Sequence, residues 1–557
     1  MGSFSPVKME LNGTDVSSYR RKGLTPLSWA AQGGHEAVVE LLLARDDVDP
    51  NAPDASGRTP LLMAAYEGHE RVVKMLLARG DIDPNTRNSF DRTPLWEAAD
   101  EGHERVVKML LERNDINPNS ACSFGETPLY KAAHKGHVGV AKMLLERDDI
   151  NPNTADMLGR TPLLVATLWG HEGVAKMLLG RADVNPNTAD DRGETPVHRA
   201  SMEGNEVVLK ALLERVDLNL NTADIYGRSP LFGAAFQGHA GAVKILLGQA
   251  EVNPNTTNIH NETPLFIAAK YGHKEVVKVL LERADVNPNI ANKLNGTPLF
   301  IAAHEGHGCI VKMLLGRSDI NPNAADNEGK TPLTVAAFYG MGGAAQTLLE
   351  CKDVNPNHID KEGATPLYRA AVLGHERVVE MLLGRAEVNP NSTFGKGDTV
   401  LSSAAMFGEE GVVKILLEQG GVNPNTTDDK GETALLKAVY WGQEEVVKVL
   451  LDHSGIDPNI AAKCGKTPLS EAACRGREAI VKMLLERVDV IYDTVDLAGE
   501  TALSQAQKNG HHSIVELLSK RKRKNPTPQP DGDKSTALPS PGPSDPDQHP
   551  SKRNRKF

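Results

Sequence analysis

Histidine followed by glutamate recurs along this chain, and that pair forms part of a metal-binding pattern. The pairs include His35-Glu36, His69-Glu70, His103-Glu104, His171-Glu172 and His375-Glu376. Zinc proteases use His-Glu-x-x-His, in which both histidines bind the metal and the glutamate is the general base. After each of these pairs, valine or another apolar residue takes the place of the second histidine. Ten of the eighteen histidines fill one slot directly after a glycine, which predicts a structural role.

Two other patterns resemble parts of catalytic sites without completing them. Gly329-Lys330-Thr331 and Gly465-Lys466-Thr467 match the end of a phosphate-binding loop, but Ala324 and Ile460 stand where the loop needs its first glycine. The five cysteines form no Cys-x-x-Cys pair, and their odd number indicates reduced thiols. The sequence therefore predicts a protein that is not an enzyme. It predicts no catalytic, metal-binding or cofactor-binding residues and no small-molecule substrate.

All these residues belong to one frame of 34 residues. Thr25-Pro26-Leu27 returns at Thr59 and continues in register to Thr501, fifteen positions without insertion or deletion. A fixed period of this kind is typical of a solenoid, in which each repeat packs only against its neighbours. Such an array can extend to 557 residues without the size limit of a single core.

The repeat beginning at Thr263 predicts two helices and an outward loop. Thr263 is a good N-cap, and Pro264 suits the first helical position, where its missing N–H costs nothing. Gly272 ends this first helix, because glycine adopts the left-handed conformation of a helix end without penalty. A second apolar helix follows His273. The segment Asn287-Pro288-Asn289 then turns the chain into the loop, and we expect the proline to stiffen it.

Thr-Pro-Leu-x-x-Ala-Ala-x-x-Gly-His, followed by Val-Val-x-x-Leu-Leu and Asp-Val-Asn, resembles the ankyrin repeat. The resemblance implies an all-α solenoid of about fifteen helix-turn-helix units with protruding finger loops, over residues 21–519. Residues 1–20 form an N-terminal segment or capping finger. The Asn-Pro-Asn fingers are most similar to those of fungal ankyrin proteins. The family usually has histidine after Thr-Pro-Leu, and among these repeats only His198 keeps it.

Residues 520–557 differ from the array in composition. Pro, Ser, Asp and Gln dominate, which predicts a disordered tail. The tail has ten positive and four negative residues, a net charge of +6. Because the whole chain has a net charge of −11, the rest of the chain has a net charge of −17. The cluster Lys520-Arg521-Lys522-Arg523-Lys524 is a candidate nuclear import signal, and the alternative is a solubilising tail that complements the last helix dipole. An array this acidic repels phosphates, so we expect no nucleic-acid partner.

The chain has no apolar run of about 20 residues and no apolar signal-peptide core near its start. We therefore expect no membrane partner and a cytoplasmic protein, with the nucleus as the alternative location. We also expect a monomer.

The ankyrin resemblance implies a concave binding surface made by finger tips and first helices. The two slots between Ala-Ala and Gly should face solvent there. They hold charge in early repeats and turn apolar from the seventh repeat onward. The predicted partner-binding residues are Phe236, Tyr271, Phe338, Tyr339, Leu373, Met406, Phe407, Tyr440 and Trp441.

The alternative for these rings is packing between first helices, which we favour for the residue directly after Thr-Pro-Leu. The function predicted is a scaffold or adaptor that binds a protein or peptide, with acidic neighbours favouring a basic partner. The alternatives are a nuclear regulator that holds a transcription factor, and a recognition arm whose other activities are supplied by separate chains.

Overall fold

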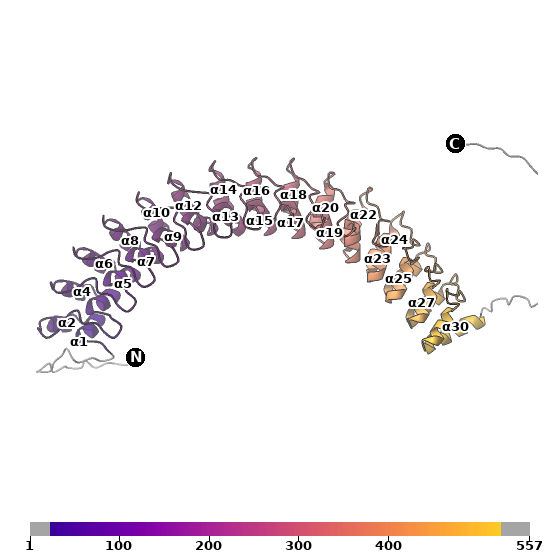
Figure 1. Ribbon diagram of the computed structural model, residues 1–557, viewed down its shortest axis with the longest axis horizontal. Helices are drawn as coiled ribbons and strands as arrows, with labels where there is room; N and C mark the ends of the chain where they lie inside the picture. Colours follow the sequence, from indigo (N-terminus) through magenta and orange to yellow (C-terminus); the bar gives the residue numbers. More distant parts are fainter. Residues whose placement is uncertain (1–22, 525–557) are drawn as a thin grey trace, which may run out of the picture. The chain divides into compact units, whose positions relative to one another are not determined.

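The computed structural model describes residues 23–524 as a series of helix pairs with a finger loop between successive pairs (Figure 1). Each pair has a first helix that begins within Thr-Pro-Leu or its equivalent, directly after the threonine or serine in most repeats, and a second helix that follows the glycine turn. The chain divides into two units. The first contains residues up to 404 and residues 414–422, and the second contains residues 405–413 and those from 423 onward.

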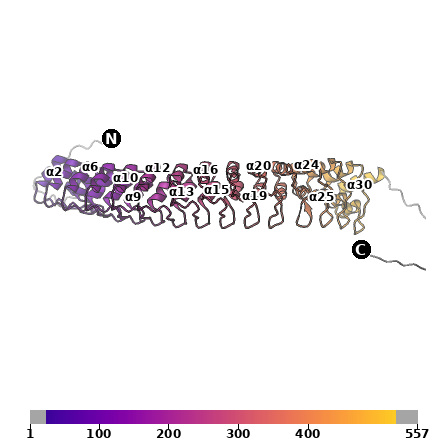
Figure 2. The same ribbon diagram turned by 90° about the horizontal axis from the view of Figure 1, so that it is seen from above.

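In the first unit, the first helices lie on the concave side and the second helices on the convex side (Figure 1). The fingers project along one edge of the row (Figure 2). The first helices are α1 (Pro26–Gln32), α3 (Pro60–Tyr66), α5 (Pro94–Glu101), α7 (Pro128–Lys135), α9 (Pro162–Leu168), α11 (Pro196–Met202), α13 (Pro230–Gln237), α15 (Pro264–Lys270), α17 (Pro298–His304), α19 (Pro332–Phe338) and α21 (Pro366–Val372). The second helices are α2 (Glu36–Leu43), α4 (Glu70–Leu77), α6 (Glu104–Leu111), α8 (Val138–Leu145), α10 (Glu172–Leu179), α12 (Glu206–Leu213), α14 (Ala240–Leu247), α16 (Lys274–Leu281), α18 (Gly308–Leu315), α20 (Gly342–Glu350) and α22 (Glu376–Leu383).

The division between the units falls within the repeat of α23 (Val400–Phe407) and α24 (Glu410–Glu418). The finger before α23 contains two short antiparallel strands, β1 (Thr393–Phe394) and β2 (Asp398–Thr399). In the second unit the first helices are α25 (Ala434–Trp441), α27 (Pro468–Cys474) and α29 (Ala502–Lys508). Its second helices are α26 (Glu444–Asp452), α28 (Glu478–Glu486) and α30 (His512–Lys524). The predicted helical solenoid is confirmed.

The helix ends follow the frame residues as predicted. The Thr263 hydroxyl accepts the Phe266 N–H at 3.1 Å, and Pro264 is the first residue of α15. All fifteen frame glycines, from Gly34 to Gly510, have a positive φ. A side chain would be strained in that conformation, so glycine is required there for the turn between the two helices.

In eight repeats the histidine that follows this glycine links adjacent repeats. The Nε2 atom of His273 lies 2.9 Å from the carbonyl oxygen of Phe236, 37 residues earlier, and can donate a hydrogen bond to it. The same contact is made by His69, His103, His137, His171, His307, His375 and His511. The predicted structural role of these histidines is therefore confirmed.

The core consists of thin layers between neighbouring helices. The paired frame alanines are fully buried, as Ala268 and Ala269 illustrate, so that first helices approach closely. The aromatic residue after Thr-Pro-Leu is buried at Trp96, Tyr130, Phe232, Phe266 and Tyr368, and Phe300 is half-buried. Our prediction that these rings pack between repeats is confirmed.

Asparagines of the Asn-Pro-Asn segments form a second set of links. The Asn255 side-chain amide donates to the carbonyl of Asp285 at 2.7 Å, and its Oδ1 accepts the N–H of Asn287 at 2.8 Å. Equivalent pairs recur at Asn51, Asn85, Asn119, Asn153, Asn187, Asn221, Asn289, Asn323, Asn357, Asn425 and Asn459. These asparagines therefore connect the base of one finger to the next.

The last helix differs from the prediction at its end. We placed the end of the array at residue 519, whereas α30 continues to Lys524. Lysine and arginine are good helix formers, so the basic cluster extends the helix. The predicted N-terminal segment 1–20 and the tail from residue 525 lie outside the described residues. Within residues 23–524, no helix is both long and apolar enough to span a membrane.

Candidate partner-binding surface

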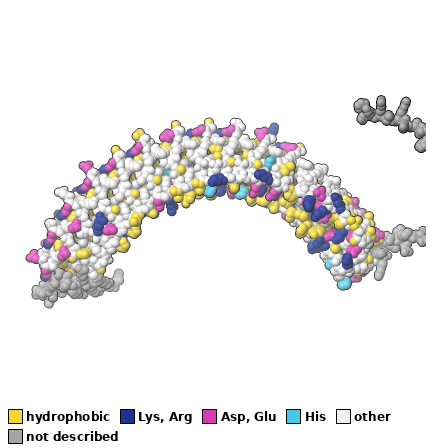
Figure 3. Space-filling view, in the orientation of Figure 1, with side chains coloured by type: hydrophobic (Ala, Val, Ile, Leu, Met, Phe, Trp, Pro, Cys, Tyr) yellow, Lys and Arg dark blue, Asp and Glu magenta, His cyan; other side chains and the backbone are white. Residues whose placement is uncertain are grey.

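The predicted partner-binding residues of the first unit lie on or at the end of first helices. Tyr271 is 49% exposed and Tyr339 is 47% exposed, while Leu373 is also exposed and Phe236 and Phe338 are half-buried. Figure 3 shows hydrophobic side chains along the concave edge of this unit. The frame residues of the same helices are buried, so the exposed residues are the ones free to vary.

Rings of successive repeats contact one another along this surface. Phe236 and Tyr271 meet edge to face at 5.2 Å between ring centres, and His304 and Tyr339 do so at 4.6 Å. Phe338 packs against Tyr339 at 4.9 Å. The rings therefore support each other while keeping an open face. Phe236 and Phe338 are half-buried, so packing between helices accounts for part of their surface, and partner binding stays a prediction.

The second unit carries its own exposed group. Phe407 is 52% exposed, Trp441 is 56% exposed, Tyr440 is exposed and Met406 is half-buried. The Tyr440 and Trp441 ring centres are 5.5 Å apart. The Arg475 guanidinium lies 3.5 Å from the Tyr440 ring centre, a cation–π contact that holds this ring in place.

The sequence prediction was wrong about where exposed aromatic residues begin. Trp29, Tyr66 and Trp169 are all exposed in the first, second and fifth repeats. Trp169 meets His134 of the preceding repeat at 5.3 Å between ring centres. Tyr66 and Trp169 stand in the slots between Ala-Ala and Gly, so the slot pattern could have identified them. Trp29 directly precedes the alanine pair, so it lies outside these two slots.

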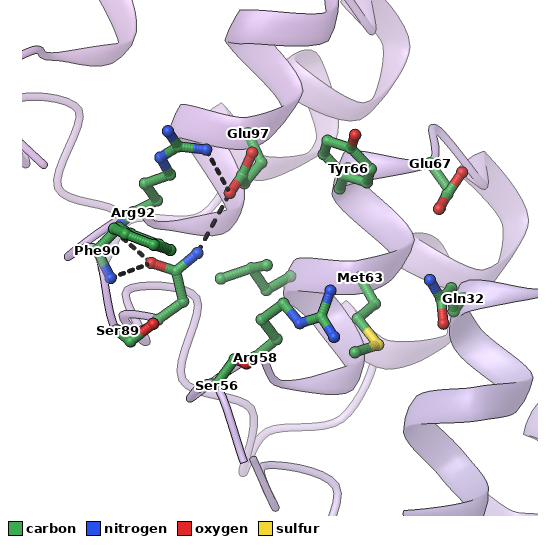
Figure 4. A pocket seen from close by; sticks show the side chains of 12 residues that line it. Gln32, Ser56, Arg58, Met63, Tyr66, Glu67, Ser89, Phe90, Arg92 and Glu97 are labelled. Carbon is green, nitrogen blue, oxygen red and sulfur yellow. Dashed lines mark hydrogen bonds and ion pairs between the residues drawn. The ribbon is translucent and has the colours of Figure 1, made fainter. Parts of the chain in front are cut away.

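An open pocket of about 310 Å³ lies among the first three repeats, between α3, α5 and two fingers (Figure 4). Its walls include Tyr66, Phe90 and Arg92, and Glu97 of α5 is also part of the lining. Glu97 is only 4% exposed. Burial raises the pKa of its carboxyl group, Arg92 opposes that rise, and the negative charges of neighbouring α5 residues add to it. This site was not predicted from the sequence.

The structure also bears on the metal-binding pattern and on the basic cluster near the end of the array. Among residues 23–524, no group of three or more His, Cys, Asp or Glu side chains is arranged to hold a metal ion. In the candidate import signal, Lys520 forms an ion pair with Glu516 at 2.6 Å, and Arg521 is half-buried. Lys522, Arg523 and Lys524 are the last residues of α30.

The chain matches a family model described as ankyrin repeats (3 copies). The match recurs in overlapping segments over residues 2–88, 48–122, 95–190, 182–258, 249–326, 299–393, 386–462 and 454–529. No match was found among the curated proteins.

Proposed function

This chain belongs to the ankyrin repeat family, whose arrays are protein–protein interaction modules, and on that premise we propose that it is a scaffold or adaptor. It binds a protein or peptide partner on the face formed by its first helices, and it does so without catalysing a reaction. The basis of the proposal is the exposure of aromatic side chains in slots that the repeat frame leaves free.

Exposed aromatics carry this proposal because folding does not require them. The buried alanines, leucines and valines already account for the packing of each repeat. Contiguous exposed apolar surface marks interaction sites, and Tyr and Trp are the residue types that most often anchor interfaces. The residues concerned are Tyr271 and Tyr339 in the first unit and Phe407, Tyr440 and Trp441 in the second.

The chemistry of the partner follows from charge and shape. The chain outside the tail has a net charge of −17, which favours partners with basic segments. Within each unit the exposed aromatic residues are spread over more than one repeat, which suits an extended segment better than a small molecule.

Partner capture followed by mass spectrometry tests the proposal. One variant replaces Tyr271, Tyr339 and Leu373 with alanine, and a second replaces Phe407, Tyr440 and Trp441. Replacing an aromatic residue at the centre of the interface with alanine should reduce the binding free energy by about 2 kcal/mol or more. At least one of the two variants should therefore lose the partner. Circular dichroism should stay native, because these side chains are exposed.

The matched control replaces Val216 and Val488 with serine. Both valines are almost fully exposed and both lie outside the first helices. The control should retain the partner captured by the wild-type chain. Retention by both aromatic variants as well would contradict the proposal.

A second candidate function is nuclear regulation, in which the array holds a transcription factor. The observation that favours it is the run of five basic residues from Lys520 to Lys524. A fluorescent fusion lacking residues 520–557 should lose nuclear accumulation if the cluster is an import signal. Unchanged distribution of the truncated fusion would exclude that role for the tail.

A further inference from the structure

One slot of the repeat allows charged residues to be compared within a single chain. It is the second residue after Thr-Pro-Leu or its equivalent, and it lies on a first helix. Its charged occupants in other repeats all have close partners of opposite charge. Lys131 lies 3.2 Å from Asp100, Arg369 2.7 Å from Asp360, Lys437 2.9 Å from Asp428 and Glu471 3.0 Å from Lys466, while Arg199 pairs with Glu194.

Glu97 occupies the same slot in the third repeat and differs from these residues. The Asn88 amide donates to its Oε1 at 3.3 Å, and Arg92 Nη1 lies 3.8 Å from that same oxygen. Its Oε2 is buried and has no hydrogen-bond partner. A buried carboxylate oxygen without a partner is unfavourable for the folded chain, because the water that solvated it has been lost.

Arg92 is held in a position from which it does not donate to both carboxylate oxygens of Glu97. Its guanidinium lies 4.3 Å from the Trp96 ring centre and 5.6 Å from that of Phe90. Stacking between these rings keeps it beside Oε1 of Glu97 and leaves Oε2 without a donor. The other arginine of the pocket, Arg58, is already paired with Asp54 at 2.7 Å.

The pocket beside Glu97 suits a positively charged side chain. In the view of Figure 4, the Glu97 carboxylate lies between Arg92 and Tyr66, and Glu67 follows Tyr66 at the edge of the pocket. The exposed Tyr66 ring and Met63 supply apolar wall for the methylene groups of a long side chain. Aromatic rings and carboxylates together attract ammonium and guanidinium groups.

We propose that this pocket binds a lysine or arginine side chain of an extended protein segment, whose cationic N–H donates to Oε2 of Glu97. The proposal rests on the proposed function, since it assumes that the concave face of the first unit holds a protein. It adds a specific requirement for a basic residue opposite the third repeat. The competing possibility is that Arg92 attracts an anionic side chain into the pocket.

Methyl NMR of the full-length chain labelled with ¹³C at methionine provides a local test. Met63 lines the pocket, and its signal is assigned with the Met63→Leu variant. The probes are the N-acetyl amides of arginine, lysine, norleucine and glutamate. Arginine or lysine amide should shift the Met63 signal saturably, and norleucine amide, which has the same apolar stem without the charge, should not. An equal response to norleucine, or a response to glutamate alone, would overturn the proposal.

The Glu97→Gln variant keeps the size of the side chain and removes its charge. A charge-assisted hydrogen bond contributes about 1.5–3 kcal/mol, so affinity for the cationic probe should fall by about tenfold to a hundredfold. The matched control is Glu471→Gln, the same change in the same slot of another repeat, where the carboxylate is already paired. Unchanged affinity in Glu97→Gln would refute the role of this carboxylate.

Two further measurements keep the test independent of folding and of the proposed function. Retained methyl dispersion and circular dichroism in Glu97→Gln show that the fold is intact, so a loss of affinity then supports the proposal. The Tyr271, Tyr339 and Leu373 triple variant should bind arginine amide with wild-type affinity, because these residues lie outside the pocket lining. If partner capture fails while the arginine response remains, the proposed function fails and the cation site stands.

Discussion

The asparagine links between fingers can be tested at a single position, Asn255. The Asn255→Ala substitution removes the amide that donates to the Asp285 carbonyl and the Oδ1 that accepts the Asn287 N–H, at 2.7 and 2.8 Å. Both lost bonds cross from one repeat to the next. The stability of a repeat array is approximately the sum of each repeat and its interfaces with its neighbours. We therefore expect this substitution to weaken one interface.

The magnitude follows from the number of bonds lost. A neutral hydrogen bond contributes about 0.5–1.5 kcal/mol, so losing two should reduce the interface free energy by about 1–3 kcal/mol. The matched control is Asn253→Ala. The Asn253 side chain accepts only the N–H of Asn255 in the same segment, so its loss should cost about 0.5–1.5 kcal/mol and leave the interface bonds in place.

Hydrogen exchange measured by mass spectrometry is the suitable assay, because a long array need not unfold in one step. In Asn255→Ala, peptides containing Asn287 should exchange faster. Peptides containing Asp83, whose N–H donates to Asn51 in the same way at 3.1 Å, should be unchanged and serve as an internal control. Wild-type exchange at Asn287, or equal effects of the Asn253 and Asn255 substitutions, would refute the reasoning.

Four other substitutions are expected to change the stability of the fold, in opposite directions or in a way that depends on pH. Gly272→Ala should destabilise by about 1–3 kcal/mol, because φ is +76° and the new Cβ would lie 2.8 Å from the His307 ring. Gly343 lies within α20, and a Cβ added there would have no atom within 4 Å, so Gly343→Ala should stabilise the fold by about 0.5–1 kcal/mol. Equal thermal unfolding temperatures for Gly272→Ala and Gly343→Ala would contradict both expectations. Trp96→Phe should cost about 1–3 kcal/mol in denaturant unfolding, because the indole N–H donates to a carbonyl of the next repeat at 2.9 Å. Burial raises the pKa of Glu97, so its contribution to stability is full below the unfolded pKa and is lost as pH rises through the folded value. The midpoint temperature of thermal unfolding of the wild type should therefore fall relative to that of Glu97→Gln as pH rises above the ordinary glutamate pKa of about 4.3, and a constant difference would show that Glu97 does not titrate in this way.

Most of the frame could be predicted because its requirements are local and repeated. Thr263 caps a helix through an N–H three residues away, and Gly272 takes a positive φ within its own turn. The slot of the histidines was identified as structural from its recurrence alone. Its bond was not, because the acceptor of His273 lies 37 residues earlier and is a backbone atom.

The remaining features depend on contacts between repeats. The sequence marks Asn255 as part of a turn but does not reveal that its partners lie 30 and 32 residues further on. Phe236 and Tyr271 looked equivalent in the sequence, and the ring contact between them leaves Tyr271 more exposed. The end of α30 was misplaced because basic residues were interpreted as tail, although lysine and arginine also extend helices.

Repetition separates residues that stabilise this fold from residues that need another explanation. Lys131 and Glu471 are charged and buried, and each is neutralised by a partner within its own unit. Glu97 stands in the same slot with one oxygen unpaired, and Tyr271 exposes an aromatic ring. Neither arrangement favours the isolated chain, because a buried unpaired oxygen destabilises the folded state and an exposed ring contributes little burial free energy. A protein segment that covers Tyr271 and places a cation beside Glu97 would remove both unfavourable features.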